Sequence, residues 1–142
     1  MPLPYGAPFS QEGKPYDLTS QSSTPAAVLI RNPYGFKYLH VWLQITAKSG
    51  AGTGGIRLDL YSYSNSLGTD QYLWADSAGV HVVDKYQWAF GPGLNNTPGA
   101  GAWYSTHRGH VPLNIPAAFY LVPSHVDANT YSYKLTYCLN GR

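Results

Sequence analysis

Two histidines lie three residues apart in the segment HRGH, and imidazoles at such a spacing can bind a metal ion. The pair is His107 and His110. A zinc site needs a third ligand and usually a fourth, and the nearest candidates, His81 and His125, have no fixed relation to the pair in the sequence. We favour a turn with exposed imidazoles. The sequence predicts no metal site and no cofactor, although it leaves metal binding by this histidine pair open.

Carboxylates are scarce, which limits hydrolytic chemistry. The chain has seven acidic residues, and only Asp59 and Asp84 lie in strong strand patterns. A glycosidase needs two carboxylates that face each other across a cleft, and no such pair is evident. Asp59 and Arg57 share the polar face of one strand, so we expect a solvated ion pair. We therefore predict that the protein is not an enzyme, and a hydrolase ranks last among the alternatives.

A glycine motif and the lone cysteine are the remaining candidates, and neither indicates a cofactor or metal site. Gly50, Gly52 and Gly55 match G-x-G-x-x-G, but a dinucleotide site needs a helix at the third glycine. The segment IRLDLYS that follows has the pattern of a strand, so the glycines indicate a loop. Cys138 is the only cysteine, which excludes an internal disulfide and a cysteine-based zinc site.

Two alternating runs on either side of this glycine-rich segment dominate the sequence. In the first run Leu39, Val41, Leu43, Ile45 and Ala47 share one parity, and aromatic or polar residues share the other. The second run, from residue 56 to residue 64, repeats the scheme. Side chains alternate between the two faces of a strand. The pattern therefore predicts an antiparallel hairpin with a long glycine-rich tip.

Further short runs separated by turn signals predict an all-β fold. Strands are expected over residues 26–31, 71–75, 80–90, 102–106, 111–115, 117–122 and 130–139. The run from 80 to 90 breaks near Asp84, which indicates a bulge or two strands, and Pro123 is expected to end the run before it. We predict an antiparallel β-sandwich of about eight strands with a jelly-roll-like topology over residues 26–142. Residues 39–47 and 131–139 should lie near the middle of a sheet.

The first 25 residues differ in composition from the remainder of the chain. Four of the five prolines, Pro2, Pro4, Pro8 and Pro15, lie among aromatic residues, and prolines at this density oppose helix and ladder pairing. We predict an extended N-terminal arm whose aromatic residues dock on a neighbouring subunit, with a disordered N-terminus as the alternative. The candidate interface residues are aromatic side chains of the arm and of the later loops: Tyr5, Phe9, Tyr16, Trp88, Trp103 and Tyr104.

The overall composition limits the kinds of molecule that the protein is expected to bind. The net charge is +2, and the nine Lys and Arg residues are dispersed, so nucleic-acid binding is not expected. The N-terminus has neither a basic region nor an apolar core, so we expect no signal peptide and synthesis in a cytoplasm. No apolar run approaches the ~20 residues of a membrane span, so none is expected. Only 11% of residues are charged and 15% are aromatic. This balance is typical of surfaces that other proteins cover.

Loop aromatics also allow a second function, carbohydrate binding. Trp74, Trp88, Trp103 and Tyr104 could form a platform for sugar rings, as in a carbohydrate-binding module or the tip domain of a phage fibre. Subunit contact relies on the same large, stiff apolar side chains. The sequence alone does not separate the two.

Two segments of the chain resemble a known class of protein. LHVWLQITAKSGAGTGGIRLDLYSYSN, from Leu39 to Asn65, and IPAAFYLVPSHVDANTYSYKLTYCLN, from Ile115 to Asn140, resemble small jelly-roll decoration proteins of tailed-phage capsids. The segments ITA-x-SG-x-G and YSYKLTY are the most specific parts. The resemblance implies a structural protein on the outer surface of the virion, made in a host bacterium. It further implies a homotrimer that bridges major capsid protein subunits and has no catalytic residues.

Overall fold

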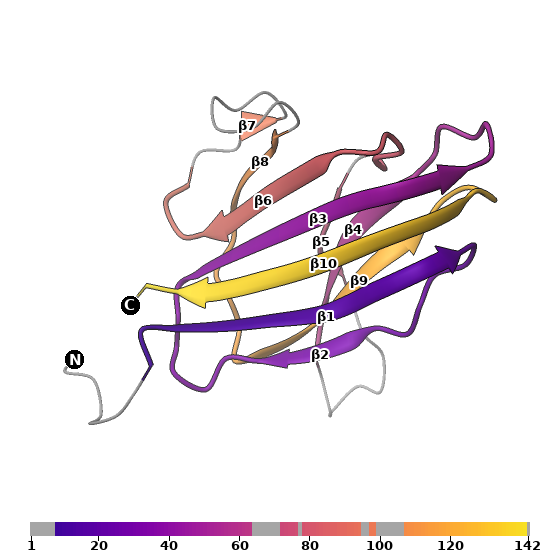
Figure 1. Ribbon diagram of the computed structural model, residues 1–142. Coiled ribbons are helices and arrows are strands. Elements are labelled where there is room, and N and C mark those ends of the chain that lie inside the picture. Colours follow the sequence, from indigo (N-terminus) through magenta and orange to yellow (C-terminus); the bar gives the residue numbers. More distant parts are fainter. Residues whose placement is uncertain (1–7, 64–71, 77, 95–96, 99–106, 142) are drawn as a thin grey trace.

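The fold consists of two β-sheets packed face to face. The computed structural model describes residues 8–63, 72–76, 78–94, 97–98 and 107–141, and within these ranges every regular element is a strand. Figure 1 shows the two layers, with β1, β10, β3 and β6 in the nearer sheet and β2, β9, β4 and β5 behind them. The predicted all-β sandwich is therefore confirmed.

The described residues form ten strands in the two sheets. The larger sheet has the order β1 (Ser10–Gln21), β10 (Thr130–Asn140), β3 (Tyr38–Ser49), β6 (Lys85–Gly91), β8 (His107–Pro112) and β7 (Thr97–Pro98). The smaller sheet has the order β2 (Val28–Arg31), β9 (Ala118–His125), β4 (Ile56–Ser62) and β5 (Tyr72–Ala75). Neighbouring strands are antiparallel except β6 and β8, which are parallel.

The strand order is that of a jelly roll. Four strands of the larger sheet, β1-β10-β3-β6, stack on the four strands β2-β9-β4-β5. Among these eight strands, taken in chain order, only β4 and β5 follow each other within one sheet. Strands β8 and β7 extend the larger sheet beyond β6. Because β3 and β10 lie inside their sheet, the prediction that these two alternating runs are central is confirmed.

Alternating residues of both sheets fill the space between the layers. Leu39, Val41, Leu43 and Ile45 of β3 are all buried, as the parity of that run predicts. The largest fully buried side chains include aromatic residues of both sheets: Trp88, Tyr131, Tyr133, Phe90 and Phe119. Side chains on the outer faces are therefore free to bind other molecules without disturbing the core.

The predicted hairpin of residues 37–64 is wrong, because β3 and β4 lie in different sheets. β3 pairs with β10 and β6, whereas β4 pairs with β9 and β5. Alternation requires only that each aliphatic face meet the core. That requirement is met equally by a hairpin and by two strands that face each other across a sandwich.

The glycine-rich connection between β3 and β4 is held by the turn between β9 and β10. The Asn129 carboxamide accepts a hydrogen bond from Gly52 N–H at 3.0 Å and donates to the Gly52 carbonyl at 2.8 Å. Asp127 Oδ2 accepts from Gly55 N–H at 2.7 Å. Gly55 has φ of 77°, and a Cβ there would lie 2.3 Å from the Val80 carbonyl oxygen. Only glycine fits this position.

Residues 10–21 form strand β1, so this part of the chain is not the separate arm predicted for residues 1–25. β1 pairs with β10 from Ser10 opposite Asn140 to Gln21 opposite Tyr131, and its register shifts between Gly13 and Tyr16, next to Pro15. Proline was expected to prevent pairing. At an edge strand with a bulge, however, the missing N–H costs little. Residues 1–7 lie outside the described ranges.

Three other strand predictions have different outcomes. The run from 80 to 90 is one isolated bridge at Val80 followed by β6 from Lys85, which agrees with the break expected near Asp84. β9 continues through Pro123, because at that level only β4 pairs with β9 and β2 has already ended. The edge strand expected over residues 102–106 lies outside the described ranges.

His125 lies beside two buried tyrosines at the end of β9. Its Nε2 lies 2.9 Å from the Tyr133 hydroxyl, and its ring contacts that of Tyr131 edge to face. The buried Nδ1 has no hydrogen-bond partner among the described residues. Burial lowers the pKa of His125, and the neighbouring Asp127 only partly opposes this shift. The His125 imidazole is therefore neutral in the folded protein near pH 7.

Stability is expected to fall as the pH drops through the range in which His125 titrates. The unfolded chain takes up a proton at this residue near pH 6.5, whereas the folded protein takes it up only at lower pH. The contribution of His125 to stability is therefore complete above about pH 6.5 and is lost as the pH falls toward the folded pKa. Urea unfolding between pH 7.5 and pH 5 should show a shallower pH dependence for His125→Gln than for the wild type. Parallel curves would contradict this assignment, since all other titrating groups are shared.

Candidate functional site

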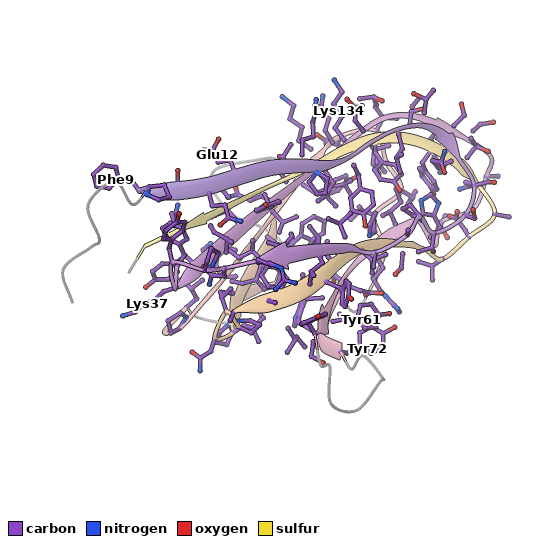
Figure 2. The ribbon with its side chains drawn as sticks, turned by 90° about the horizontal axis from the view of Figure 1, so that it is seen from below. Phe9, Glu12, Lys37, Tyr61, Tyr72 and Lys134 are labelled. Carbon is purple, nitrogen blue, oxygen red and sulfur yellow. The ribbon has the colours of Figure 1, made fainter. Side chains whose placement is uncertain are left out.

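Three of the six predicted interface residues lie in the described part of the chain, and only one of these three is exposed. Phe9 immediately precedes β1 and is 86% exposed, whereas Tyr16 is 4% and Trp88 1% exposed. Figure 2 shows Phe9 projecting from the end of the sandwich. Tyr16 and Trp88 lie at inward parities of their strands, so the prediction that they form a surface is wrong. Tyr5, Trp103 and Tyr104 lie outside the described residues.

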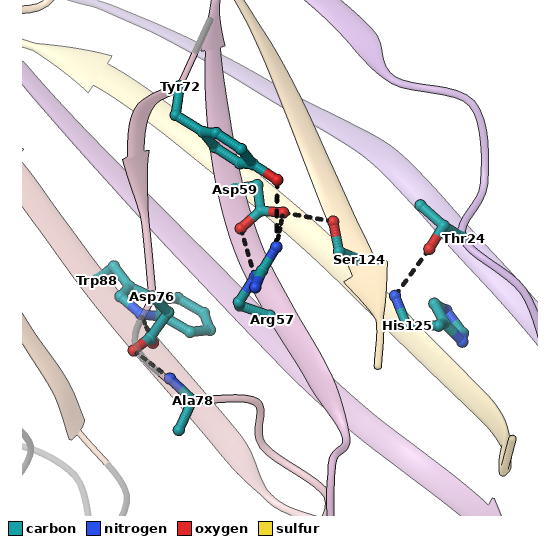
Figure 3. Close-up of polar contacts among 9 residues, drawn as sticks. All are labelled: Thr24, Arg57, Asp59, Tyr72, Asp76, Ala78, Trp88, Ser124 and His125. Atoms are coloured by element: carbon teal, nitrogen blue, oxygen red, sulfur yellow. Dashed lines mark hydrogen bonds and ion pairs between the residues drawn. The ribbon is translucent and has the colours of Figure 1, made fainter. Parts of the chain in front are cut away.

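The two described tryptophans of the proposed sugar platform do not form one. Trp74 packs edge to face on Phe90, with ring centroids 5.0 Å apart. Trp88 lies in the core, and its indole N–H donates to Asp76 at 2.9 Å (Figure 3). Both side chains serve the packing of the sandwich.

Asp59 and Arg57 form the expected ion pair, but the Asp59 carboxylate is fully buried, so the prediction that the pair is solvated is wrong for this side chain. Arg57 Nε and Nη2 donate to Asp59 Oδ1 and Oδ2 at 2.9 and 3.0 Å, and the Ser124 hydroxyl donates to Oδ2 at 2.5 Å (Figure 3). Arg57 Nη2 also donates to the Tyr72 hydroxyl at 3.3 Å. Both oxygens of the Asp59 carboxylate therefore accept hydrogen bonds from side chains of the smaller sheet.

Tyrosines surround this ion pair on the outer face of the smaller sheet. The rings of Tyr61 and Tyr72 lie 4.4 Å apart, and Arg57 lies 6.0 Å from the Tyr72 ring centroid. Burial, together with the hydrogen bond to Tyr72, raises the pKa of Tyr61. Figure 2 shows Tyr61 and Tyr72 on the side of the sandwich opposite Lys134. The two stacked tyrosines present flat, partly apolar surface.

The outer face of the larger sheet carries a groove that sequence reasoning did not identify. It has a volume of about 320 Å³ and is lined mainly by side chains of β3, β6 and β10. The lining side chains on this outer face are Trp42, Gln44, Lys85, Gln87, Lys134 and Thr136. A volume of this size lies at the lower end of the range for small-molecule sites.

Strand register brings these side chains together. Thr136 lies opposite Trp42, and Trp42 lies opposite Gln87, so one row crosses β10, β3 and β6. Lys134, Gln44 and Lys85 form the next row in the same way. Directly opposed residues of an antiparallel pair share a face and approach within contact distance. A tryptophan ring is therefore framed by amide, hydroxyl and ammonium groups.

A second hollow continues the groove toward the edge of the sheet. It is lined by Trp42 and Thr136, which it shares with the first, and by residues of β1 and β10 that include Glu12 and Lys14. The imidazole of His40 stacks on Trp42 with centroids 5.8 Å apart. Burial, and to a lesser degree His110, lowers the pKa of His40. The neutral imidazole therefore supports one side of the tryptophan ring.

Gln87 forms the most enclosed polar part of the groove. Its side chain is 4% exposed, and its Oε1 has no hydrogen-bond partner among the residues that the structure describes. An unpaired buried amide oxygen is unfavourable by about 1–3 kcal/mol. Trp42 could have been noticed from the sequence, since it lies on the mixed face of the alternating run. Gln87 had no such signal.

Metal ligands do not gather in the described part of the chain. No group of three or more His, Cys, Asp or Glu side chains there could hold a metal ion. The side chain of His107 is not among those described, and His110 lies in β8. Nor does the described chain contain a helix that could cross a membrane.

Comparisons with known proteins leave the chain without an assigned relative. No family model, no curated protein and no solved structure matches it.

Proposed function

We propose that this chain is a structural protein of a tailed-phage virion that decorates and stabilises the outer surface of the capsid. In this proposal it acts as a homotrimer that bridges major capsid protein subunits. The resemblance of residues 39–65 and 115–140 to decoration proteins supports it, as does the jelly-roll order of the eight main strands. Many copies on one lattice would attach firmly even if each contact is weak.

The observation that carries the proposal is the position of Phe9. Its ring is 86% exposed and stands at the end of the sandwich where β1 begins (Figure 2). Exposed phenylalanine is unfavourable in water, and aromatic residues that fill a partner's pocket dominate the free energy of many interfaces. A capsid subunit that buries this ring would gain both area and specificity.

The environment of the strand carboxylates supports a non-catalytic role. Asp59 is buried under Arg57 and accepts a hydrogen bond from Ser124. Asp84 accepts from the N–H of Lys85 through its side chain and from the N–H of Ile45 through its carbonyl. Both acids therefore have hydrogen-bond partners within the fold.

Replacing Phe9 is expected to reduce capsid occupancy without affecting the fold. Phe9→Ser should lower binding to capsids stripped of decoration by about tenfold or more, because the anchor ring is lost. Val126→Ser, which removes an exposed apolar side chain at the opposite end of β10, is the matched control and should bind like the wild type. Co-sedimentation with particles measures occupancy, and circular dichroism verifies the fold. Equal occupancy of the two variants would exclude Phe9 as the anchor.

A further inference from the structure

The groove over Trp42 combines an aromatic ring with hydrogen-bonding side chains, as the binding of a sugar ring requires. A pyranose has an apolar face that stacks on an aromatic ring and a rim of hydroxyls that donate and accept hydrogen bonds. Trp42 supplies the ring, and Thr136 and Gln87 lie on either side of it by strand register. Gln44 and Lys134, both exposed, border the same hollow and can bond to hydroxyl or ring oxygens.

Gln87 is the feature that points to a ligand. Its side chain is more than nine-tenths buried, lines the groove and keeps an amide oxygen without a partner among the described residues. A buried acceptor of this kind is normally satisfied. The oxygen itself has almost no exposed surface, so a sugar hydroxyl satisfies it once the Gln87 carboxamide turns toward the groove, whereas a purely apolar ligand would leave it unsatisfied.

The shape of the surface favours a chain of sugars over a single one. The hollow lined by Glu12, Lys14 and Tyr137 shares Trp42 and Thr136 with the first one, and its volume is about 520 Å³. Both hollows lie on the outer face of the larger sheet, the side on which Figure 2 shows Glu12 and Lys134. A linear saccharide could therefore place one ring on Trp42 and extend across β10 to β1.

We propose that this groove is a saccharide-binding site, with Trp42 as the stacking platform and Gln87 as the acceptor for a sugar hydroxyl. The site lies elsewhere than Phe9, so it does not depend on attachment to a capsid. It also differs from the tryptophans that the sequence indicated. The bound group is a pyranose ring within an oligosaccharide.

The test uses the free, full-length protein labelled with ¹⁵N and a panel of neutral and uronic-acid hexasaccharides at up to about 10 mM. The Trp42 indole and Gln87 carboxamide signals are expected to shift with at least one sugar and to give a saturable curve. Trp42→Ala should weaken binding by about tenfold or more. Gln87→Leu, which keeps the size of the side chain and removes the acceptor, should weaken it by about threefold to tenfold.

A control variant and two opposing outcomes make the test decisive. Tyr34→Ala removes an exposed aromatic ring outside the groove and should bind like the wild type. Unchanged Trp42 and Gln87 signals with every sugar would overturn the proposal. Shifts confined to the Tyr61 and Tyr72 surface would overturn it equally. Capsid occupancy of Trp42→Ala should equal that of the wild type, so failure here leaves the decoration role intact.

Discussion

Asn129→Ala is expected to lower the free energy of unfolding by about 2–3 kcal/mol. The Asn129 side chain is 6% exposed and spans the turn between β9 and β10 and the glycine-rich connection. It pairs with both the N–H and the carbonyl of Gly52, and its amide also lies 3.1 Å from Asp127 Oδ2 and from the Tyr131 hydroxyl. Alanine would leave the two Gly52 groups without this partner in a part-buried site.

A matched asparagine tests this explanation. Asn114 is exposed and makes no side-chain hydrogen bond among the described residues, so Asn114→Ala should change stability by less than about 0.5 kcal/mol. Urea unfolding of both variants at pH 7 measures the difference. Equal stabilities would mean that the connection holds its shape without the Asn129 amide.

Tyr16→Ala is expected to lower the free energy of unfolding by about 3–5 kcal/mol, more than Asn129→Ala, because it leaves a cavity in the core. The ring is 4% exposed and reaches from β1 toward the smaller sheet, where its hydroxyl lies 2.9 Å from the Leu121 carbonyl oxygen and 2.7 Å from that of Ala26. Burial raises the pKa of this phenol to about 12, so it remains a donor at any physiological pH. Tyr16 therefore joins the two layers.

Two variants separate the contributions of the ring and the hydroxyl. Tyr16→Phe keeps the ring and should cost about 1 kcal/mol, whereas Tyr34→Ala, at an exposed position, should cost less than about 1 kcal/mol. Thermal unfolding gives the order of stabilities. Tyr16→Ala as stable as Tyr34→Ala would show that β1 contributes little to the core.

The effect of an N-terminal truncation on the fold should depend on whether the truncation removes β1. Removing residues 1–8 leaves every described strand in place, whereas removing residues 1–24 takes away β1, exposes the edge of β10 and removes Tyr16 from the core. The longer truncation is therefore expected to unfold or aggregate. The initial expectation of a separable arm over residues 1–25 would have predicted the opposite.

The fold class could be predicted because alternation leaves few physical solutions. Leu39 to Ile45 and Tyr131 to Leu139 each present an apolar side that must be buried, and two such sheets bury it by stacking. β1 was missed because Pro15 and the neighbouring aromatics resemble an unpaired segment. The register shift beside Pro15 allows the proline within an edge strand, and no pattern of residues around Pro15 indicates that shift.

The candidate site could be predicted only in part. Phe9 was among the interface residues proposed from composition, and the structure leaves it exposed. Tyr16 and Trp88 were proposed on the same ground and are buried, because aromatic side chains suit a core and an interface equally. Trp42, Gln87 and Thr136 come from strands far apart in the chain, so no local spacing relates them.

The amino-acid sequence by itself determined which face of each strand is buried, since side-chain direction alternates with a period of two whatever the neighbours are. Only the tertiary structure decided which strands become neighbours, and hence that β3 and β4 oppose each other across the core and that Trp42 meets Gln87. The physical reason is that ladder hydrogen bonds join backbone groups that are alike at every residue other than proline. Pairing is therefore selected by the packing of the whole sandwich and not by the residues of any one strand.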